Sequence, residues 1–208
     1  MGTLTRIVGL ITLVGASVSC GDVVRTGRAP VFLTIDSLLG SRGNTSPGPM
    51  TNPLISDVIT NVTSPPPCTT QSPCPTIFDD VGQVTLRTEL KDIGSPSNPV
   101  SSSTNNDVTI TRYHVQYTRA DGRNTPGIDV PYPFDGAVTG TIQVGSPRTL
   151  TFELVRHAAK LEAPLLPLRV SPTIITTISY VTFYGQDRVG NEITATGTVQ
   201  VDFGNFGD

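Results

Sequence analysis

Residues 192–203 read Glu-Ile-Thr-Ala-Thr-Gly-Thr-Val-Gln-Val-Asp-Phe, and they show the clearest two-residue period in the chain. The odd-numbered positions from Ile193 to Phe203 are apolar or small. The even-numbered positions from Thr194 to Asp202 are polar. Because successive side chains of a strand point to opposite faces, this pattern predicts a strand with one buried face and one face in water. The protein is therefore expected to be built on β-sheet.

The same reasoning extends upstream. Residues 84–91 alternate, with Val84, Leu86 and Leu90 on one face. In 108–118 the alternation changes phase near Thr111 and Arg112, which predicts a β-bulge because one extra residue shifts the side-chain phase. Further strands are predicted from β-branched and alternating runs at 31–39, 53–59, 137–144, 149–155 and 176–184. Residues 156–163 predict one or two helical turns that end before Pro164.

Composition agrees with a fold of strands and turns. The 208 residues include 20 Gly and 18 Pro, and only 15% are charged. The sequence predicts an all-β protein with one domain over 31–208, an antiparallel immunoglobulin-like β-sandwich of about seven or eight strands. A jelly roll or a small barrel would give much the same pattern. A long loop rich in Gly, Ser and Pro is expected over 40–76.

One hairpin carries a family resemblance. Residues 181–191 read Val-Thr-Phe-Tyr-Gly-Gln-Asp-Arg-Val-Gly-Asn. An aromatic residue, then Asp, then Gly-Asn before the last strand resembles the penultimate-strand hairpin of bacterial immunoglobulin-like and fibronectin-like modules. The resemblance covers only the region of the last two strands. The core Trp usual in those modules is absent, since the chain has no Trp.

The first twenty residues predict export. The apolar run over 7–16 is too short to span a bilayer but fits a signal peptide over 1–19. Small residues and then Cys20 follow, which resembles the signal of bacterial lipoproteins and implies lipidation of Cys20. The sequence departs from that signal at Ser17, where a Leu-like residue is usual. The alternative is ordinary cleavage near 16–19, with Cys20 left as a thiol.

The same resemblance predicts a cellular location and a partner. Residues 20–30 are then a lipidated tether, and the partner is a membrane reached through that anchor. Gly21 stands where Asp would mark retention at the inner membrane, so the outer membrane of a bacterial envelope is favoured. A secreted soluble protein is the alternative.

Cysteine usage agrees with this assignment. The chain has three cysteines, and lipidation of Cys20 leaves Cys68 and Cys74 as a pair. A disulfide between them would close a short ring within the long loop. Five residues separate them, unlike the two of a redox motif, and no further ligands for zinc stand nearby.

No catalytic constellation is apparent. The sequence after the signal contains no nucleophile elbow and no phosphate-binding loop, and His114 and His157 stand without metal-ligand partners. Asp187 with Asn191 is a weak calcium candidate, as is Asp121 with Asn124. No metal or other cofactor is predicted. The net charge of −3 gives no field that would attract nucleic acid.

These observations rank three functional hypotheses. The first is an exported, lipid-anchored, non-enzymatic envelope protein, a binding or structural module whose partners are envelope proteins or glycans. The second is a secreted enzyme with a site assembled from loops, which would need Asp79, Asp80, Asp121 or His157 to converge. The third is a self-assembling surface subunit joined edge to edge.

Overall fold

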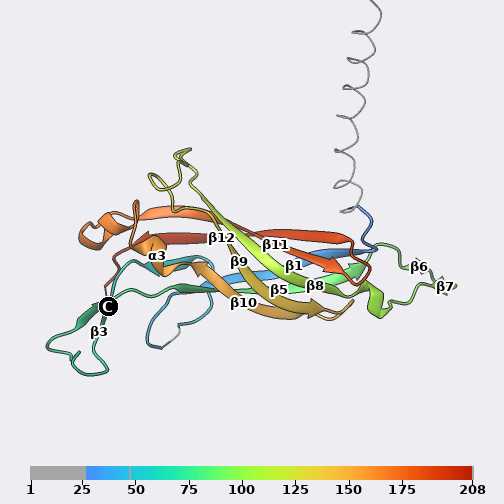
Figure 1. Cartoon of the computed structure of the whole chain (residues 1–208), viewed down its shortest axis with the longest axis horizontal. Helices are drawn as coiled ribbons and strands as arrows, with labels where there is room; N and C mark the ends of the chain where they lie inside the picture. The colour runs from blue at the N-terminus through green and yellow to red at the C-terminus, as the bar shows by residue number, and fades with distance from the viewer. Residues whose placement is uncertain (1–26, 47, 208) are drawn as a thin grey trace, which may run out of the picture.

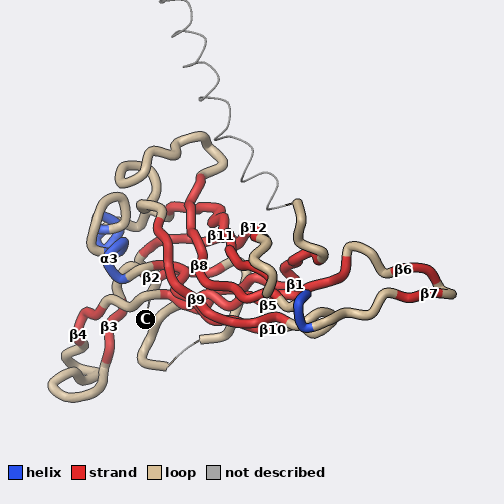
Figure 2. Tube along the Cα trace, turned by 45° about the vertical axis from the view of Figure 1, so that its right-hand side comes forward, coloured by secondary structure: helices blue, strands red, loops and turns tan. Residues whose placement is uncertain are grey.

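The structure is a computed structural model, and it describes residues 27–46 and 48–207. The predicted signal peptide, Cys20 and most of the predicted tether lie outside the described residues. Within the described part, no helix is both long and apolar enough to cross a bilayer. Two β-sheets form the body of the protein (Figures 1 and 2).

The smaller main sheet has three strands in the order β1-β5-β10, and both pairings are antiparallel. Its strands are β1 (Val31–Ser41), β5 (Asp80–Leu90) and β10 (Arg148–Val155). The larger sheet has five strands in the order β2-β12-β11-β8-β9. These are β2 (Leu54–Asp57), β12 (Glu192–Gly204), β11 (Ile175–Asp187), β8 (Val108–Thr118) and β9 (Phe134–Ile142).

The all-β prediction is confirmed, and the two main sheets of the described chain contain eight strands. Every pairing in the larger sheet is antiparallel except β2 with β12, which is parallel. In β12 the inward positions Val199, Val201 and Phe203 are fully or almost fully buried. The predicted bulge is present, since the register of β8 shifts between Ile110 and Arg112.

Aromatic side chains join the two sheets. Phe152 of β10 lies 5.0 Å from the ring of Tyr113 on β8 and 5.3 Å from Phe183 on β11 (centroid distances). Tyr117 of β8 donates a 2.6 Å hydrogen bond to the carbonyl of Leu154 on β10. Gly82 leaves room for Phe152, because a Cβ there would lie 2.4 Å from the ring. One continuous hydrophobic core therefore fills the space between the sheets.

The expected long loop over 40–76 contains three of the strands. β2 falls within the predicted 53–59 strand, and β3 (Thr60–Val62) pairs with β4 (Cys74–Thr76). That hairpin projects from one end of the molecule. At the other end projects the hairpin of β6 (Gly94–Ser95) and β7 (Asn98–Pro99), as Figure 2 shows.

Helical structure is sparse in the described residues. The α-helix α3 (His157–Lys160) falls inside the predicted 156–163 segment. Two short 3-10 helices, η1 (Thr104–Asn106) and η2 (Leu166–Val170), were not predicted.

Candidate functional site

A groove runs between the edge strand β1 and strand β12. It encloses about 470 Å³ and lies where the two sheets approach without pairing. Its lining residues come from β1, from β12 and from the segment before β2: Leu33, Thr34, Ile35, Asp36, Ser37, Leu38, Asn52, Ala195, Thr196, Gly197 and Thr198. The groove is therefore bounded by two extended strands along its length.

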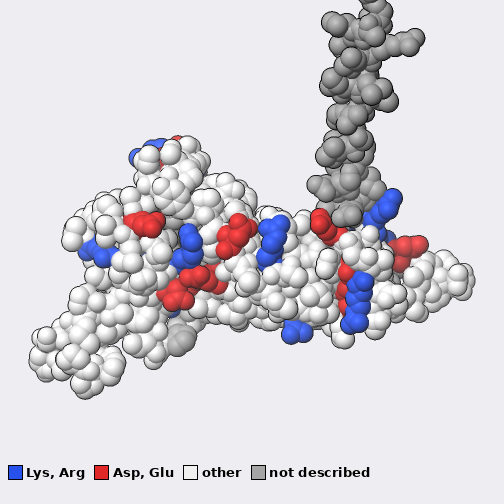
Figure 3. Space-filling model, in the orientation of Figure 1, with Lys and Arg blue, Asp and Glu red and all other residues white. Residues whose placement is uncertain are grey.

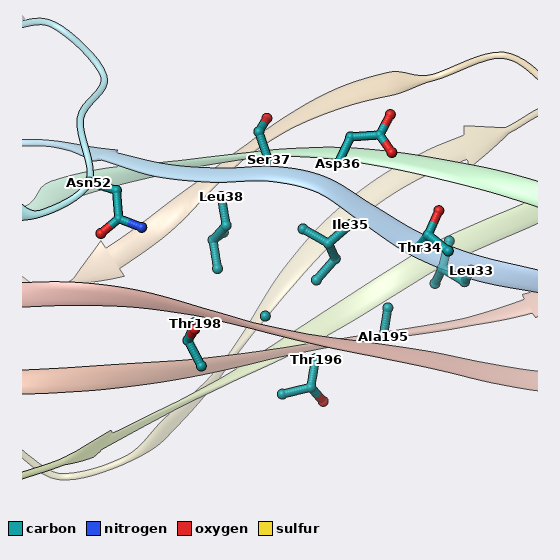
Figure 4. Close-up of a pocket in the computed structure, with 11 residues that line it drawn as sticks. Leu33, Thr34, Ile35, Asp36, Ser37, Leu38, Asn52, Ala195, Thr196 and Thr198 are labelled. Carbon is teal, nitrogen blue, oxygen red and sulfur yellow. The ribbon is translucent and has the colours of Figure 1, made fainter. Parts of the chain in front are cut away.

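The floor of the groove is apolar. Figure 4 shows Ile35 and Leu38 pointing from β1 toward β12, while Asp36 and Ser37 point away from it. A Cβ at Gly197 would lie 2.9 Å from Cδ1 of Ile35 and 3.1 Å from Cδ2 of Leu38. The absence of a side chain at Gly197 thus lets the two strands come close.

The β12 wall of the groove is an open strand edge. β2 pairs with β12 only from Val201 to Gly204, so no strand of the described chain continues this pairing toward the start of β12. The N–H of Gln200 donates a 3.2 Å bond to Oδ1 of Asn52, which places its backbone groups on the groove side. Because bonding direction alternates along a strand, the backbone groups of Thr196 and Thr198 also face the groove.

The β1 wall is less regular. The register of β1 against β5 shifts between Ile35 and Ser37, which leaves Asp36 as the extra residue of a bulge. The Asp36 carboxylate accepts two bonds from the Arg87 guanidinium, at 2.8 and 3.0 Å. A bulge and a charged residue interrupt β1 as a template for a further strand, so β12 is the better template in this groove.

A second cluster is fully enclosed. Nζ of Lys160 lies 2.8 Å from Oδ1 of Asp80, and the side chains are 1% and 0% exposed. The hydroxyl of Ser56 donates to Oδ2 of Asp80 at 2.5 Å, and the N–H of Gly43 donates to Oδ1 at 2.8 Å. Four segments meet at this carboxylate: the loop after β1, strand β2, the start of β5 and helix α3.

Opposing effects act on the carboxyl of Asp80. Burial raises its pKa above the ordinary value of 3.8, while the charge and hydrogen bond of Lys160 and the bonds from Ser56 and Gly43 lower it. The net direction is upward, because complete burial outweighs the partners. Because both charged side chains are sealed from solvent, the cluster fixes the junction of the four segments.

The residues considered for a loop-built site have different surroundings. Asp79 is exposed, whereas its neighbour Asp80 is buried against Lys160. Asp121 lies between β8 and β9, where the Arg119 and Arg123 guanidiniums hold the pKa of its carboxyl well below the usual range. His157 is exposed at the start of α3.

The two histidines make no metal site in the described chain. Nδ1 of His114 lies 3.2 Å from Oδ1 of Asp135 on the neighbouring strand. No group of three or more His, Cys, Asp or Glu residues within 27–46 and 48–207 is placed to hold a metal ion.

Asp187 and Asn191 do meet, at the turn between β11 and β12. Oδ1 of Asp187 accepts from the N–H groups of Val189 at 3.0 Å and Asn191 at 2.8 Å, and Oδ2 accepts from Nδ2 of Asn191 at 2.7 Å. Asp187 is almost fully buried. Its oxygens are thus engaged in closing the hairpin turn, as Asp side chains often are.

The predicted disulfide is present. Cys68 and Cys74 are bonded, with their Cα atoms 5.3 Å apart. Cys74 opens β4 and Cys68 lies in the turn that joins β3 to β4, so the bond closes the projecting hairpin at its tip. The whole segment from Thr60 to Thr76 contains no charged residue.

Sequence reasoning missed Lys160, Ser56 and Gly197. Lys160 stands in the segment His-Ala-Ala-Lys, which reads as an ordinary exposed helical turn. Its partner Asp80 is 80 residues away. Because Asp80 stands next to Asp79, the two together indicate an exposed polar loop. No local pattern marks such a pair, because burial of the two charges depends on the packing of segments far apart in sequence.

Comparison with known proteins adds little. No protein-family model matches the chain, and no curated protein matches it. A solved structure described as "X-ray structure of Northeast Structural Genomics Consortium target SoR45" aligns with 83% of this chain and 86% of its own, at 12% identity and a TM-score of 0.34. A likeness at that level supports no argument about fold family or activity.

Proposed function

We propose that this chain is an exported, lipid-anchored and non-enzymatic protein of the bacterial cell envelope, which binds an extended segment of another envelope protein. The open edge of β12 in the groove carries the binding part of this proposal. The signal-like sequence before Cys20 supports export and anchoring.

The strand order supports assigning the domain to the immunoglobulin-like class. In that class one sheet holds strands A, B, E and D, the other holds G, F and C, and the two sheets face each other. The three-stranded sheet of the described chain has no strand in the place of D. Here β1-β5-β10 and β12-β11-β8 follow the same chain order, and β9 extends the second sheet beside β8. The hairpin resemblance over residues 181–191 supports the same assignment.

Strand addition is the binding mode that the groove fits. An added strand would pair with the outward backbone groups of Thr196 and Thr198, and its alternate side chains would lie over Ile35 and Leu38. Main-chain hydrogen bonds then give affinity, and the apolar floor selects small or β-branched side chains. Partners with an exposed, extended and apolar segment fit this description.

The anchor is tested with Cys20→Ser. We expect the wild-type protein in the membrane fraction, with an intact mass that includes lipid on Cys20, and the variant in the soluble fraction. A variant that stays in the membrane fraction would refute anchoring through this residue.

The groove is tested with Thr196→Pro. The N–H of Thr196 faces the groove, so proline there removes a donor that an added strand needs without breaking the pairing with β11. Thr196→Val, which keeps the N–H, is the matched control. With a photo-crosslinking residue at Asn52, whose side chain lies on the groove side of β12, we expect a defined adduct in cells for the wild type and Thr196→Val, and its loss for Thr196→Pro. An adduct that persists in Thr196→Pro would refute strand addition.

The same open edge favours one second candidate, a self-assembling surface subunit in which the added strand comes from another copy. Sedimentation of the purified protein separates the two. A monomer at high concentration excludes assembly through this edge, whereas a series of oligomers that Thr196→Pro abolishes would replace the first proposal.

A further inference from the structure

The end of the domain where the described chain begins carries exposed apolar side chains. Ile93 and Val100 flank the β6–β7 hairpin and are 73% and 48% exposed, and Phe32 at the start of β1 is 55% exposed. The hairpin projects from the same end at which the described chain begins, as Figure 1 shows. Its segment from Ile93 to Asn106 contains no charged residue, and its tip is uncharged in Figure 3.

Contacts tie this hairpin to the beginning of the described chain. The N–H of Lys91 donates to the carbonyl of Pro30 at 2.9 Å, and Nζ of Lys91 lies 3.5 Å from the carbonyl of Gly27. The same ammonium group lies 5.3 Å from the centre of the Phe32 ring. Gly27 and the base of the hairpin are therefore held side by side.

The length of the tether sets how far this end can stand from a membrane. Seven residue steps separate Cys20 from Gly27, and a fully extended chain spans at most about 3.6 Å per residue, or roughly 25 Å in all. With lipid on Cys20, Gly27 and the base of the hairpin beside it thus stay within roughly 25 Å of the bilayer surface.

We propose that Ile93 and Val100 enter the bilayer interface, so that the domain rests on the membrane through its β6–β7 hairpin. This inference rests on the anchoring part of the proposed function. Charges of both signs surround the hairpin, with Arg28 and Lys91 beside Glu89 and Asp92, all exposed. Contact therefore depends on apolar side chains, and anionic lipid is not required.

The far end of the domain is then presented to partners. It carries the disulfide-closed β3–β4 hairpin and η2, at the end opposite the one where the described chain begins (Figure 1). A single anchor would leave the domain free to tumble, whereas a second contact fixes its orientation relative to the membrane.

The absence of tryptophan provides a clean test. Full-length lipidated Ile93→Trp is placed in phosphatidylcholine vesicles that contain a brominated lipid. The matched control is Val170→Trp, at a site in η2 that is 92% exposed. We expect the bromine atoms to lower the emission of Ile93→Trp by about twofold and to leave that of Val170→Trp unchanged, with equal effects at low and high salt. Val100→Trp repeats the measurement at a second position of the hairpin.

Each outcome decides the inference. Lipidated protein whose Ile93→Trp and Val100→Trp emissions both remain unquenched overturns it and leaves the anchor intact. Protein that lacks lipid and does not sediment with vesicles overturns the anchor and this inference together. Quenching of Ile93→Trp in the Cys20→Ser background supports the hairpin contact independently of the lipid.

Discussion

Nζ of Lys160 lies 2.8 Å from Oδ1 of Asp80, and the pair is sealed from solvent although 80 residues separate the two in sequence. A buried pair of this kind is costly to break from one side, because the remaining charge keeps neither water nor partner. Replacing both residues together with uncharged ones costs less stability, because no unpaired charge is then left buried.

The first prediction concerns that asymmetry. Asp80→Asn leaves Lys160 without its counter-charge and is expected to lower the free energy of unfolding by about 3–5 kcal/mol. Asp80→Asn combined with Lys160→Met should be clearly more stable than Asp80→Asn alone. Urea unfolding measures all three proteins. Asp36→Asn, which breaks a partly exposed pair with Arg87, is the control and should cost under about 1 kcal/mol. Additive costs in the double variant would contradict the prediction.

The second prediction concerns pH. Burial raises the pKa of Asp80 in the folded protein above the 3.8 of the free side chain, so the folded state keeps this proton to higher pH than the unfolded state does. The resulting contribution to stability is present below the unfolded pKa and is lost as pH rises from 3.8 through the folded pKa. The reference is the Asp80→Asn, Lys160→Met double variant, in which other carboxyls titrate alike.

The measurement is the difference in unfolding free energy between wild type and this reference, followed upward from about pH 4. We expect the wild type to lose stability relative to this reference as pH rises through this window. Movement in the opposite direction would show that Lys160 outweighs burial and lowers the pKa.

The third prediction concerns Gly82. A Cβ at this position would lie 2.4 Å from the Phe152 ring, so Gly82→Ala should displace the ring that joins the two sheets and cost about 1–3 kcal/mol or more. Phe152→Leu in the same chain should recover part of this loss. Gly48→Ala is the control, because its nearest neighbour would be 3.7 Å away. Equal melting temperatures for the two alanine variants would contradict the packing argument.

The fourth prediction concerns the β11–β12 turn. Asp187→Ala removes an acceptor from two backbone N–H groups and one side-chain amide, and we expect a loss of about 1–3 kcal/mol. Asp92→Ala, at an exposed turn where one N–H is bonded, should cost less. Since the oxygens of Asp187 are already engaged, millimolar calcium should not change the melting temperature of the wild type. A clear rise with calcium would restore a metal-binding role to Asp187 and Asn191.

Local patterns predicted much of the framework. The alternation in residues 192–203 predicted β12, and the phase change near Thr111 predicted the bulge in β8. Both are short-range properties, because a strand with one buried face must place apolar residues at every second position. The pairing of Cys68 with Cys74 was also accessible, since assigning Cys20 to a lipid anchor leaves these two cysteines as the pair.

The candidate sites were much less accessible to sequence reasoning. The groove exists because β2 starts opposite Val201 and leaves the earlier part of β12 uncovered, and nothing near Leu54 encodes that register. In the sequence, Gly197 indicates only a residue that weakens a strand. It does not indicate that the side chains of Ile35 and Leu38 pack against β12 at this position. These features depend on contacts between distant segments, which no local pattern reports.

The position of β2 has a consequence for the order of folding. In its sheet β2 is paired with β12, which follows it in the chain only after β5, β8, β9, β10 and β11. The backbone groups of β2 therefore wait for a partner from a distant segment, and closure of this pairing is a non-local step. Non-local steps of this kind are slow. Until the step is complete, an uncovered apolar surface makes folding intermediates prone to aggregate.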